Sequence, residues 1–252
     1  MPVPPAPAGR LDAIDALRGL AMVWMTVYHF CFDLNHFGYL KQSFNTDPLW
    51  TWQRTAIVSL FLFTAGLGQA TAVARGQSWP RFWRRWAQVA ACAMLVSIGS
   101  WWMFPASYIF FGVLHGLAVM LLIARLSAGW GPWLWGLGAL AIAMPSIASW
   151  IHSTLGWVDF YSFFDQKALQ GVGLVSRKPV TEDYVPLLPW LGVMWWGLAC
   201  GNRLHRSQAP WLRWQPGRLG QKLAVLGRWS LSYYMLHQPV MIGVLMAVAA
   251  LK

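Results

Sequence analysis

With 252 residues the chain is long enough for one or two water-soluble domains, but 57% of its residues are hydrophobic and only 11% are charged. Soluble domains carry about 25% charged residues, so this composition excludes a water-exposed globule and indicates a protein of the lipid bilayer. The net charge of +11 does not indicate nucleic acid, because the arginines lie between apolar runs rather than on one continuous basic face.

Residues 1–12 are expected to form a short proline-rich tail on the cytosolic side, without a removable signal peptide. After this tail, seven stretches approach the length of about 20 apolar residues that a membrane-spanning helix needs. They are 14–35, 50–74, 82–103, 108–126, 130–150, 185–201 and 229–251. We therefore predict an all-α, polytopic transmembrane bundle of about seven helices, in a single domain at 13–252 with an outer loop at about 152–184.

The positive residues predict how this bundle is oriented. If the N-terminus is cytosolic, 13 of the 19 lysines and arginines fall on the cytosolic side and six on the outer side. Asp12 and Asp15 are then the two cytosolic acids, and the other six acids lie outside, which gives a net charge of +11 inside and zero outside. Positive residues concentrate in cytoplasmic loops, so this asymmetry favours a cytosolic N-terminus.

The first predicted helix places its ionisable residues on one face. At about 100° per residue, five of them fall within an arc of about 60°; they are Asp15, Arg18, His29, Asp33 and His36. Such residues in membrane helices normally face a protein interior or a water-filled cavity. Asp15 can pair with Arg18, and Asp33 can orient the His29 imidazole as a base. The structural alternative is an interfacial ion pair and a hydrogen-bonded core histidine.

The last predicted helix carries a second polar face. His237 and Tyr234 share that face, and Pro239 leaves one backbone carbonyl without its helical partner. An interfacial aromatic belt with a proline kink is the structural alternative. In the fourth predicted helix, His115 lies about two turns from the start, between glycines that favour close helix packing.

Two further charged residues and the cysteines complete the candidates. Asp183 precedes the sixth predicted helix, where a carboxylate can bind substrate or cap the helix. Arg54, near the outer start of the second helix, is expected to face an acidic group. The six histidines are dispersed without metal-ligand spacing, so we expect no metal site. The cysteines lie in or beside apolar runs and are expected to be small buried hydrophobes: Cys31, Cys92 and Cys200.

Several motifs carry a family resemblance when taken in order. They are IDALRGLAMVWMTVYHFCFDL, FLFTAGLG, FGVLHGLAV, DYVPLLPWLG and LGRWSLSYYMLHQPV. From residue 10 to about 240, the chain resembles bacterial members of the heparan-α-glucosaminide N-acetyltransferase-like family, part of a wider group of transmembrane acyltransferases that modify glycans. The resemblance implies a multi-pass protein of the bacterial inner membrane that transfers an acyl group, acetyl above all, from cytosolic acyl-CoA to a hydroxyl or amine of an envelope glycan or glycolipid.

The resemblance also implies a catalytic histidine near the outer end of the first helix. His29 matches the histidine of the RG…H pattern in the wider group, and His36 is the reserve candidate, closer to the first outer loop. Asp33 would orient the base, and Arg18 would bind CoA phosphates. The remaining candidates would line the route or position the acceptor: Asp15, Arg54, His115, Asp183, Tyr234 and His237. A transporter or flippase and a non-catalytic subunit of an envelope-modifying complex are the alternatives, and the oligomeric state is open, a homodimer included.

Overall fold

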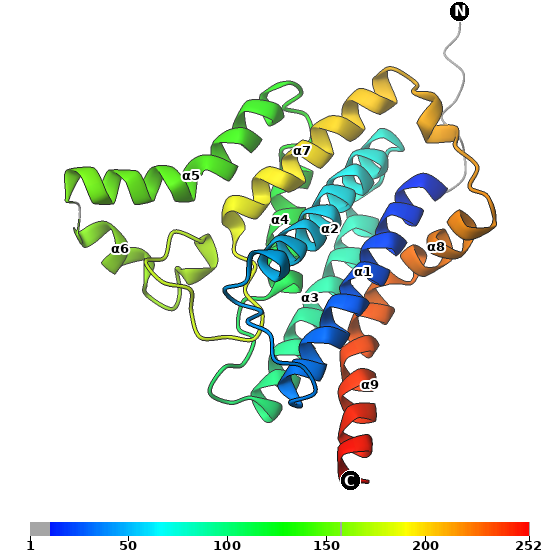
Figure 1. Cartoon of the computed structure of the whole chain (residues 1–252). Coiled ribbons are helices and arrows are strands. Elements are labelled where there is room, and N and C mark those ends of the chain that lie inside the picture. Colours follow the sequence, from blue (N-terminus) through cyan, green and yellow to red (C-terminus); the bar gives the residue numbers. More distant parts are fainter. Residues whose placement is uncertain (1–10, 157, 252) are drawn as a thin grey trace, which may run out of the picture. The chain divides into compact units, whose positions relative to one another are not determined.

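The computed structural model describes residues 11–156 and 158–251, so most of the expected tail, residues 1–10, lies outside the described residues. Within these ranges the regular elements are all helical, and one isolated bridge joins Phe111 to Tyr184 (Figure 1). The all-α prediction is thus confirmed. In chain order the elements are α1 (Asp12–His36), α2 (Pro48–Ala74), α3 (Trp79–Met103), α4 (Val113–Leu126), α5 (Trp133–Leu155), α6 (Val158–Phe164), η1 (Gln170–Val172), α7 (Leu187–Arg206), η2 (Pro210–Arg213), α8 (Arg218–Arg228) and α9 (Ser230–Ala250).

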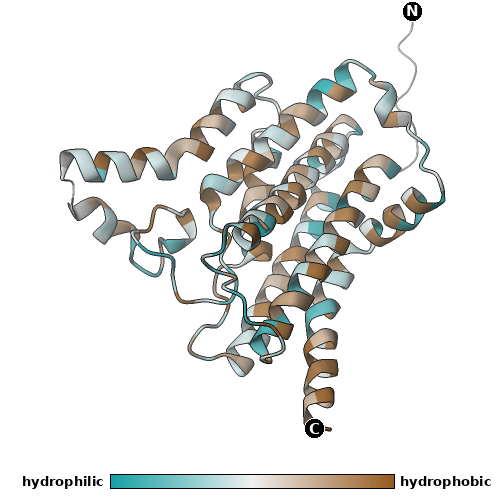
Figure 2. Ribbon diagram, viewed as in Figure 1, coloured by the Kyte–Doolittle hydropathy of each residue, from teal (hydrophilic) through white to brown (hydrophobic). Residues whose placement is uncertain are grey.

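Four helices of the described residues are long and apolar enough to cross a membrane. They are α2, α3, the segment Trp133–Thr154 of α5, and α9. Hydrophobic residues predominate in the C-terminal half of α9 (Figure 2). Both α3 and α9 expose large apolar side chains, including Trp102 and Met246, as lipid-facing helices do. These four helices support a membrane protein, while the count of seven spans and the cytosolic N-terminus stay predictions.

Each of the seven predicted spans contains a helix, but the fourth is shorter than expected. It starts at Val113 rather than at residue 108, and α4 has only 14 residues. The preceding residues lie beside the segment before α7 instead: the Val185 N–H donates to Phe111 O at 3.2 Å, and the Glu182 N–H donates to Ser107 O at 2.9 Å. These inter-segment bonds use backbone groups that an earlier helix start would need.

The chain divides into two compact units, and each is described by itself below. The first unit comprises residues 1–64 and 208–252, and thus α1, the start of α2, η2, α8 and α9. The second unit comprises residues 65–207, from the later part of α2 to α7. The first unit is therefore built from the N-terminal and the C-terminal parts of the chain.

In the first unit, α1 packs against α8 with almost no space between their backbones. A Cβ atom on Gly19 would lie 1.9 Å from the carbonyl oxygen of Leu223, and one on Gly227 would lie 1.8 Å from the carbonyl oxygen of Asp15. Atoms cannot approach that closely, so only glycine fits at both positions. Since α9 follows α8 after a single residue, Trp229, this contact also fixes where α9 starts beside α1.

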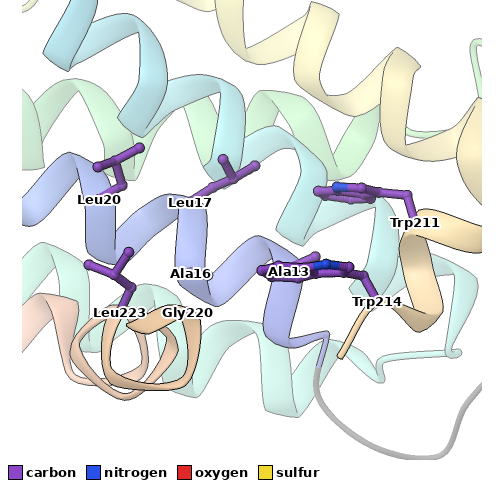
Figure 3. A pocket seen from close by; sticks show the side chains of 8 residues that line it. All are labelled: Ala13, Ala16, Leu17, Leu20, Trp211, Trp214, Gly220 and Leu223. Carbon is purple, nitrogen blue, oxygen red and sulfur yellow. The ribbon is translucent and has the colours of Figure 1, made fainter. Parts of the chain in front are cut away.

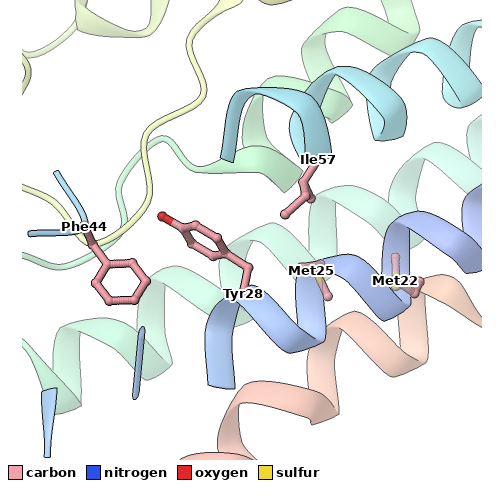
Figure 4. Close-up of a cluster of buried hydrophobic side chains, with 5 residues drawn as sticks. All are labelled: Met22, Met25, Tyr28, Phe44 and Ile57. Atoms are coloured by element: carbon pink, nitrogen blue, oxygen red, sulfur yellow. The ribbon is translucent and has the colours of Figure 1, made fainter. Parts of the chain in front are cut away.

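The hydrophobic core of the first unit lies along the middle of α1 (Figure 4). Tyr28 meets the Phe44 ring edge to face at 5.7 Å, and Phe44 stacks on Trp50 at 4.1 Å. Met22, Met25 and Ile57 complete the buried cluster. This core holds the loop after α1 and the start of α2 against α1, and so sets the surroundings of the α1 polar face.

In the second unit, α5 packs on α7 and α3 packs on α4. Gly138 and Gly192 again let two backbones meet, since a Cβ on Gly192 would lie 2.4 Å from Gly138 O. The indole N–H of Trp86 donates to Ala118 O at 2.8 Å, which ties α3 to α4. The three cysteines of the chain are free thiols and half-buried, so the expectation of full burial is only partly met.

Candidate functional site

The polar face of α1 points into the first unit along most of its length, as predicted. Only 5% of Asp15 and 3% of Asp33 is exposed, and the Arg18 side chain is 15% exposed. His29 is half-buried, with its Nδ1 atom fully covered. His36, in the last turn, is exposed. The polar face is therefore largely covered from Asp15 to Asp33 and reaches solvent at His36.

At the N-terminal end of α1, the predicted Asp15–Arg18 ion pair is present. Arg18 Nη1 lies 3.0 Å from Asp15 Oδ1. Arg228 joins from α8, with Nη2 2.7 Å from Asp12 Oδ1 and Nε 3.8 Å from Asp15 Oδ2. Sequence reasoning missed Arg228 because it lies 213 residues after Asp15 in the chain. This four-membered network links α1 to α8 and favours the structural alternative for Asp15 and Arg18.

Further along α1, His29 faces His237 of α9. Their ring centroids lie 5.3 Å apart, with the ring planes inclined at 59°. His237 Nδ1 lies 2.7 Å from Tyr234 O. A carbonyl oxygen can only accept, so Nδ1 carries the proton, and the Nε2 of a neutral His237 holds a lone pair. The predicted polar faces of the first and last helices thus meet at a pair of imidazoles.

Two tyrosines hold the His237 ring. The Tyr233 ring is parallel to it, with centroids 5.9 Å apart and planes inclined at 7°, and the Tyr234 ring lies 5.6 Å away. The Tyr233 hydroxyl lies 2.7 Å from Thr26 Oγ1, which itself donates to Met22 O at 2.8 Å. Tyr233 is therefore the donor to Thr26. These contacts place Tyr233 in the interior of the unit rather than in an aromatic belt.

Asp33 has a different partner from the one that its spacing suggested. Its Oδ1 accepts a hydrogen bond from Gln238 Nε2 at 3.0 Å, rather than from His29. Three buried polar atoms of this cluster have no hydrogen-bond partner among the described residues: His29 Nδ1, Asp33 Oδ2 and His237 Nε2. Buried polar atoms are nearly always satisfied in native proteins, so these three atoms on two facing helices mark a place where a water, an ion or a ligand can bind.

His36 and Arg54 lie at the rim of the same unit. His36 lines a pocket of about 360 Å³ between the end of α1 and the loop that follows it, and it lies within electrostatic range of the Asp33 carboxylate. Arg54 lies within electrostatic range of the Tyr28 hydroxyl. None of the ion pairs among the described residues includes Arg54, so the expected acidic partner is not found there.

A second pocket, of about 250 Å³, lies near the N-terminal end of α1 between α1, η2 and α8 (Figure 3). Its lining is apolar, and the indole rings of Trp211 and Trp214 form one end of it. Arg218 and Lys222 are exposed on α8, the helix that forms one wall. The sequence-based spans did not include α8, an amphipathic helix of only 11 residues.

In the second unit, His115 has hydrogen-bond partners at both ring nitrogens. Ser97 Oγ donates to Ile109 O at 2.6 Å, so it accepts from His115 Nε2 at 3.0 Å. His115 Nδ1 in turn accepts the Gly112 N–H at 3.3 Å. Each nitrogen therefore has a partner that fits one neutral tautomer. This arrangement favours a structural role for His115, closing the N-terminus of α4.

Asp183 also closes the start of α4. Its Oδ2 accepts the Val113 N–H at 2.7 Å, and a Cβ on Gly112 would lie 2.4 Å from the same oxygen. A carboxylate at a helix N-terminus binds unpaired N–H groups and is stabilised by the helix dipole. Of the two roles that the sequence left open, the cap is thus observed, although on α4 rather than on the following helix.

Comparison with known proteins identifies the family. The family model described as "Heparan-alpha-glucosaminide N-acetyltransferase, catalytic" matches residues 10–239. The chain therefore belongs to this family of membrane acetyltransferases, as its motifs predicted. No significant match was found among curated proteins or among solved structures.

Proposed function

We propose that this protein is a membrane-bound acyltransferase that moves an acyl group, in the first instance acetyl, from cytosolic acyl-CoA to a hydroxyl or amine of a glycan or glycolipid, in a bacterial inner membrane. Membership of the acetyltransferase family supports the reaction class. The observation that carries the chemistry is the set of three buried, unpartnered polar atoms on His29, Asp33 and His237.

The chemistry follows from what those atoms can do. A thioester is already an activated acyl donor, so the acceptor is the group that needs help, by loss of its proton to a general base. His237 Nε2 holds a lone pair because Nδ1 donates to Tyr234 O. In this proposal Nε2 takes the acceptor's proton while the acceptor oxygen or nitrogen bonds to the thioester carbonyl carbon. The carbon–sulfur bond then breaks, and the leaving thiolate takes the proton to give free CoA.

His29 and Asp33 act beside this base. The His29 ring lies beside that of His237, with ring centroids 5.3 Å apart, and Asp33 Oδ2 is available to accept a hydrogen bond from a second group of the acceptor. Gln238 holds the other oxygen of Asp33 and so fixes the carboxylate. Positioning of this kind lowers the barrier by removing the need to order the acceptor.

For the donor, we propose the apolar pocket beside Trp211 and Trp214. Aromatic side chains stack with bases such as adenine, and the exposed cations of Arg218 and Lys222 can bind phosphates. The pocket reaches Leu20, nine residues before His29 on α1, or about 14 Å along the helix axis. An extended thioester arm has to cover that distance for the acyl group to reach the imidazole pair.

The test uses the full chain in lipid nanodiscs, supplied with acetyl-CoA and a glucosaminide, the acceptor that the family name specifies. Free CoA is measured with a thiol reagent and the acylated product by mass spectrometry. We expect kcat to fall at least about 100-fold in His29→Asn and in His237→Asn. The control is His205→Asn, which removes a histidine of the second unit that hydrogen-bonds Thr71. Wild-type rates in both site variants, or movement of the sugar across the bilayer without acylation, would overturn the proposal.

A further inference from the structure

We propose that Arg54 of α2 and the Tyr28 hydroxyl of α1 form a binding site for an oxyanion, that is, for a carboxylate, phosphate or sulfate group. Arg54 lies six residues after the start of α2, a helix that is long and apolar enough to cross a membrane. Its side chain is half-buried. Both residues belong to the first unit, and binding of an oxyanion there does not require the transfer reaction to take place.

Two contacts between α1 and α2 fix the position of Arg54. The Trp24 indole N–H donates to Gln53 Oε1 at 3.2 Å, and the Tyr28 ring meets the Trp50 ring edge to face at 5.9 Å. Residues four apart share one face of a helix, so Arg54 lies on the same face of α2 as Trp50. Arg54 is also within electrostatic range of the Tyr28 hydroxyl. The guanidinium therefore lies on the side of α2 that faces α1.

The acids of the first unit do not pair with Arg54. The unit contains four acids, all among the described residues: Asp12, Asp15, Asp33 and Asp47. The first two belong to the arginine network at the start of α1. The third accepts from Gln238, and the fourth accepts the Leu49 N–H at 2.8 Å. None of the ion pairs among the described residues joins any of these acids to Arg54.

The burial of Arg54 sets it apart from the other cations of the unit. The lysines and arginines there whose side chains are described either pair with an acid or are exposed, apart from Arg54. Covering a cation without a counter-ion costs free energy. Ionisable residues within membrane helices normally have a partner or a functional role. A ligand that carries a negative charge supplies the counter-ion that the first unit does not.

Tyr28 provides a second donor of the site. Only 7% of the residue is exposed, and its ring is held in edge-to-face contact with Phe44 and Trp50. Its hydroxyl points away from Met22 and Met25 (Figure 4), and it makes no hydrogen bond with the described residues. A guanidinium offers two parallel N–H donors that match a carboxylate or a phosphate. With the hydroxyl nearby, the site offers three donors and one positive charge, which suits an oxyanion.

The test measures thermal unfolding of the full chain in dodecyl maltoside, an uncharged detergent, by tryptophan fluorescence at constant ionic strength. Phosphate, sulfate, acetate and phosphatidylglycerol are added separately. We expect at least one of them to raise the unfolding midpoint of the wild type. Its apparent Kd should be at least about tenfold higher in Arg54→Gln and about fivefold higher in Tyr28→Phe, which loses one uncharged donor. The matched control is Lys41→Gln, which removes one positive charge from an exposed side chain of the same unit and should keep the wild-type Kd.

The midpoint without added anion provides a second readout. Arg54→Gln should then be more stable than the wild type, because it removes a covered charge that has no counter-ion. A cation that is neutralised by an acid of the protein would behave in the opposite way. A lower midpoint for Arg54→Gln, with the response to anions retained, therefore overturns the proposal and makes Arg54 a partner in a structural ion pair.

The four ligands also separate the two sources of an oxyanion. A response to phosphate, sulfate or acetate that is lost in Arg54→Gln indicates a small soluble ligand. A response to phosphatidylglycerol alone, lost in the same variant, indicates a lipid headgroup. Either result supports the site, whether or not the chain transfers acyl groups. If no ligand stabilises the wild type, or if Arg54→Gln and Lys41→Gln respond as the wild type does, the site is overturned.

Discussion

Gly227 of α8 touches the backbone of Asp15 in α1, so that a Cβ on the glycine would lie 1.8 Å from the Asp15 carbonyl oxygen. The same aspartate carries the ion pair to Arg18, and Arg228 follows the glycine directly. Backbone contact and charge network thus occupy one turn of each helix. Because α9 follows after Trp229, the contact decides where His237 stands along α1.

Substitution of Gly227 by alanine should therefore separate α1 from α8. We expect Gly227→Ala to lower the thermal unfolding midpoint and to reduce the rate of acyl transfer, since His237 shifts with α9. The measurement is thermal unfolding of the purified chain in detergent. Gly243→Ala is the control, because a Cβ there meets nothing within 4 Å and alanine adds about 1 kcal/mol of helix propensity. Equal midpoints for both variants would show that the close contact is not needed.

The two acids of the ion network should contribute unequally to the stability of the fold. Asp12 is about one-third exposed, and its pair with Arg228 contributes at most about 1 kcal/mol. Asp15 is buried, and its removal leaves the covered Arg18 without its carboxylate, at a cost of about 3 kcal/mol. We therefore expect Asp15→Asn to lower the thermal unfolding midpoint more than Asp12→Asn does. The reverse order would contradict the burial of Asp15.

Tyr233 allows its hydroxyl and its ring to be tested separately. Tyr233→Phe loses the hydrogen bond to Thr26, worth about 1 kcal/mol of unfolding free energy, but keeps the ring parallel to His237. We expect it to retain kcat within about twofold, whereas Tyr233→Leu should lower kcat because His237 loses the stacked ring. Steady-state kinetics beside thermal unfolding provide the measurement. Equal kcat values in the two variants would show that the Tyr233 ring does not position His237.

Asp183 offers a test of cap against substrate contact. Asp183→Asn keeps an oxygen that can accept the Val113 N–H, while Asp183→Ala loses it at a cost of about 1 kcal/mol. If the residue is only a cap, the alanine variant should lower the unfolding midpoint with KM for both substrates unchanged. A raised KM in the asparagine variant, with normal stability, would instead return Asp183 to the substrate site.

The contribution of Tyr184, in the segment before α7, to the free energy of unfolding should depend on pH. Its hydroxyl donates to Gln170 O at 2.6 Å, and burial, followed by the nearby Asp165 charge, raises its pKa from the ordinary value of 10.0 to about 12. The neutral form is therefore favoured in the folded state. The stability that Tyr184 adds is fully present below pH 10 and is lost as the pH rises from 10 through about 12. Urea unfolding of wild type and Tyr184→Phe across this interval should show the difference between them shrinking; a constant difference would contradict the shift.

The sequence was sufficient for much of the architecture. Each of the seven apolar runs contains a helix of the described residues, because hydrophobic length is a local property. The 100° rule placed Asp15, His29 and Asp33 on one inward face. Periodicity also indicated the second polar face, around His237. The missed α8 was detectable in the same way, since it is an amphipathic helix that is merely too short to be a span.

Other features depend on partners that a local pattern does not specify. The facing of His29 and His237, 208 residues apart, needs the α1–α8 contact through Gly19 and Gly227. The spacing of His29 and Asp33 suggested a hydrogen bond, but Gln238 from another helix takes the Asp33 oxygen. The 108–112 segment looked helical because it is apolar, and only its pairing with the segment before α7 shows otherwise.

Because α1 packs against the last helices of the chain, its contacts form only late in synthesis. At about 5–20 residues per second, the ribosome reaches His237 on the order of 10–40 s after His29 has been made. During that interval α1 has neither Arg228 for its acids nor the α9 ring for its histidine. The nascent first helix therefore has to wait in the insertion machinery or the bilayer with Asp12 lacking Arg228 and Asp33 lacking Gln238, although Asp15 can already pair with Arg18. A truncation that removes α9 is expected to leave α1 exposed to membrane quality control, and degradation of the shortened chain in cells would report that waiting state directly.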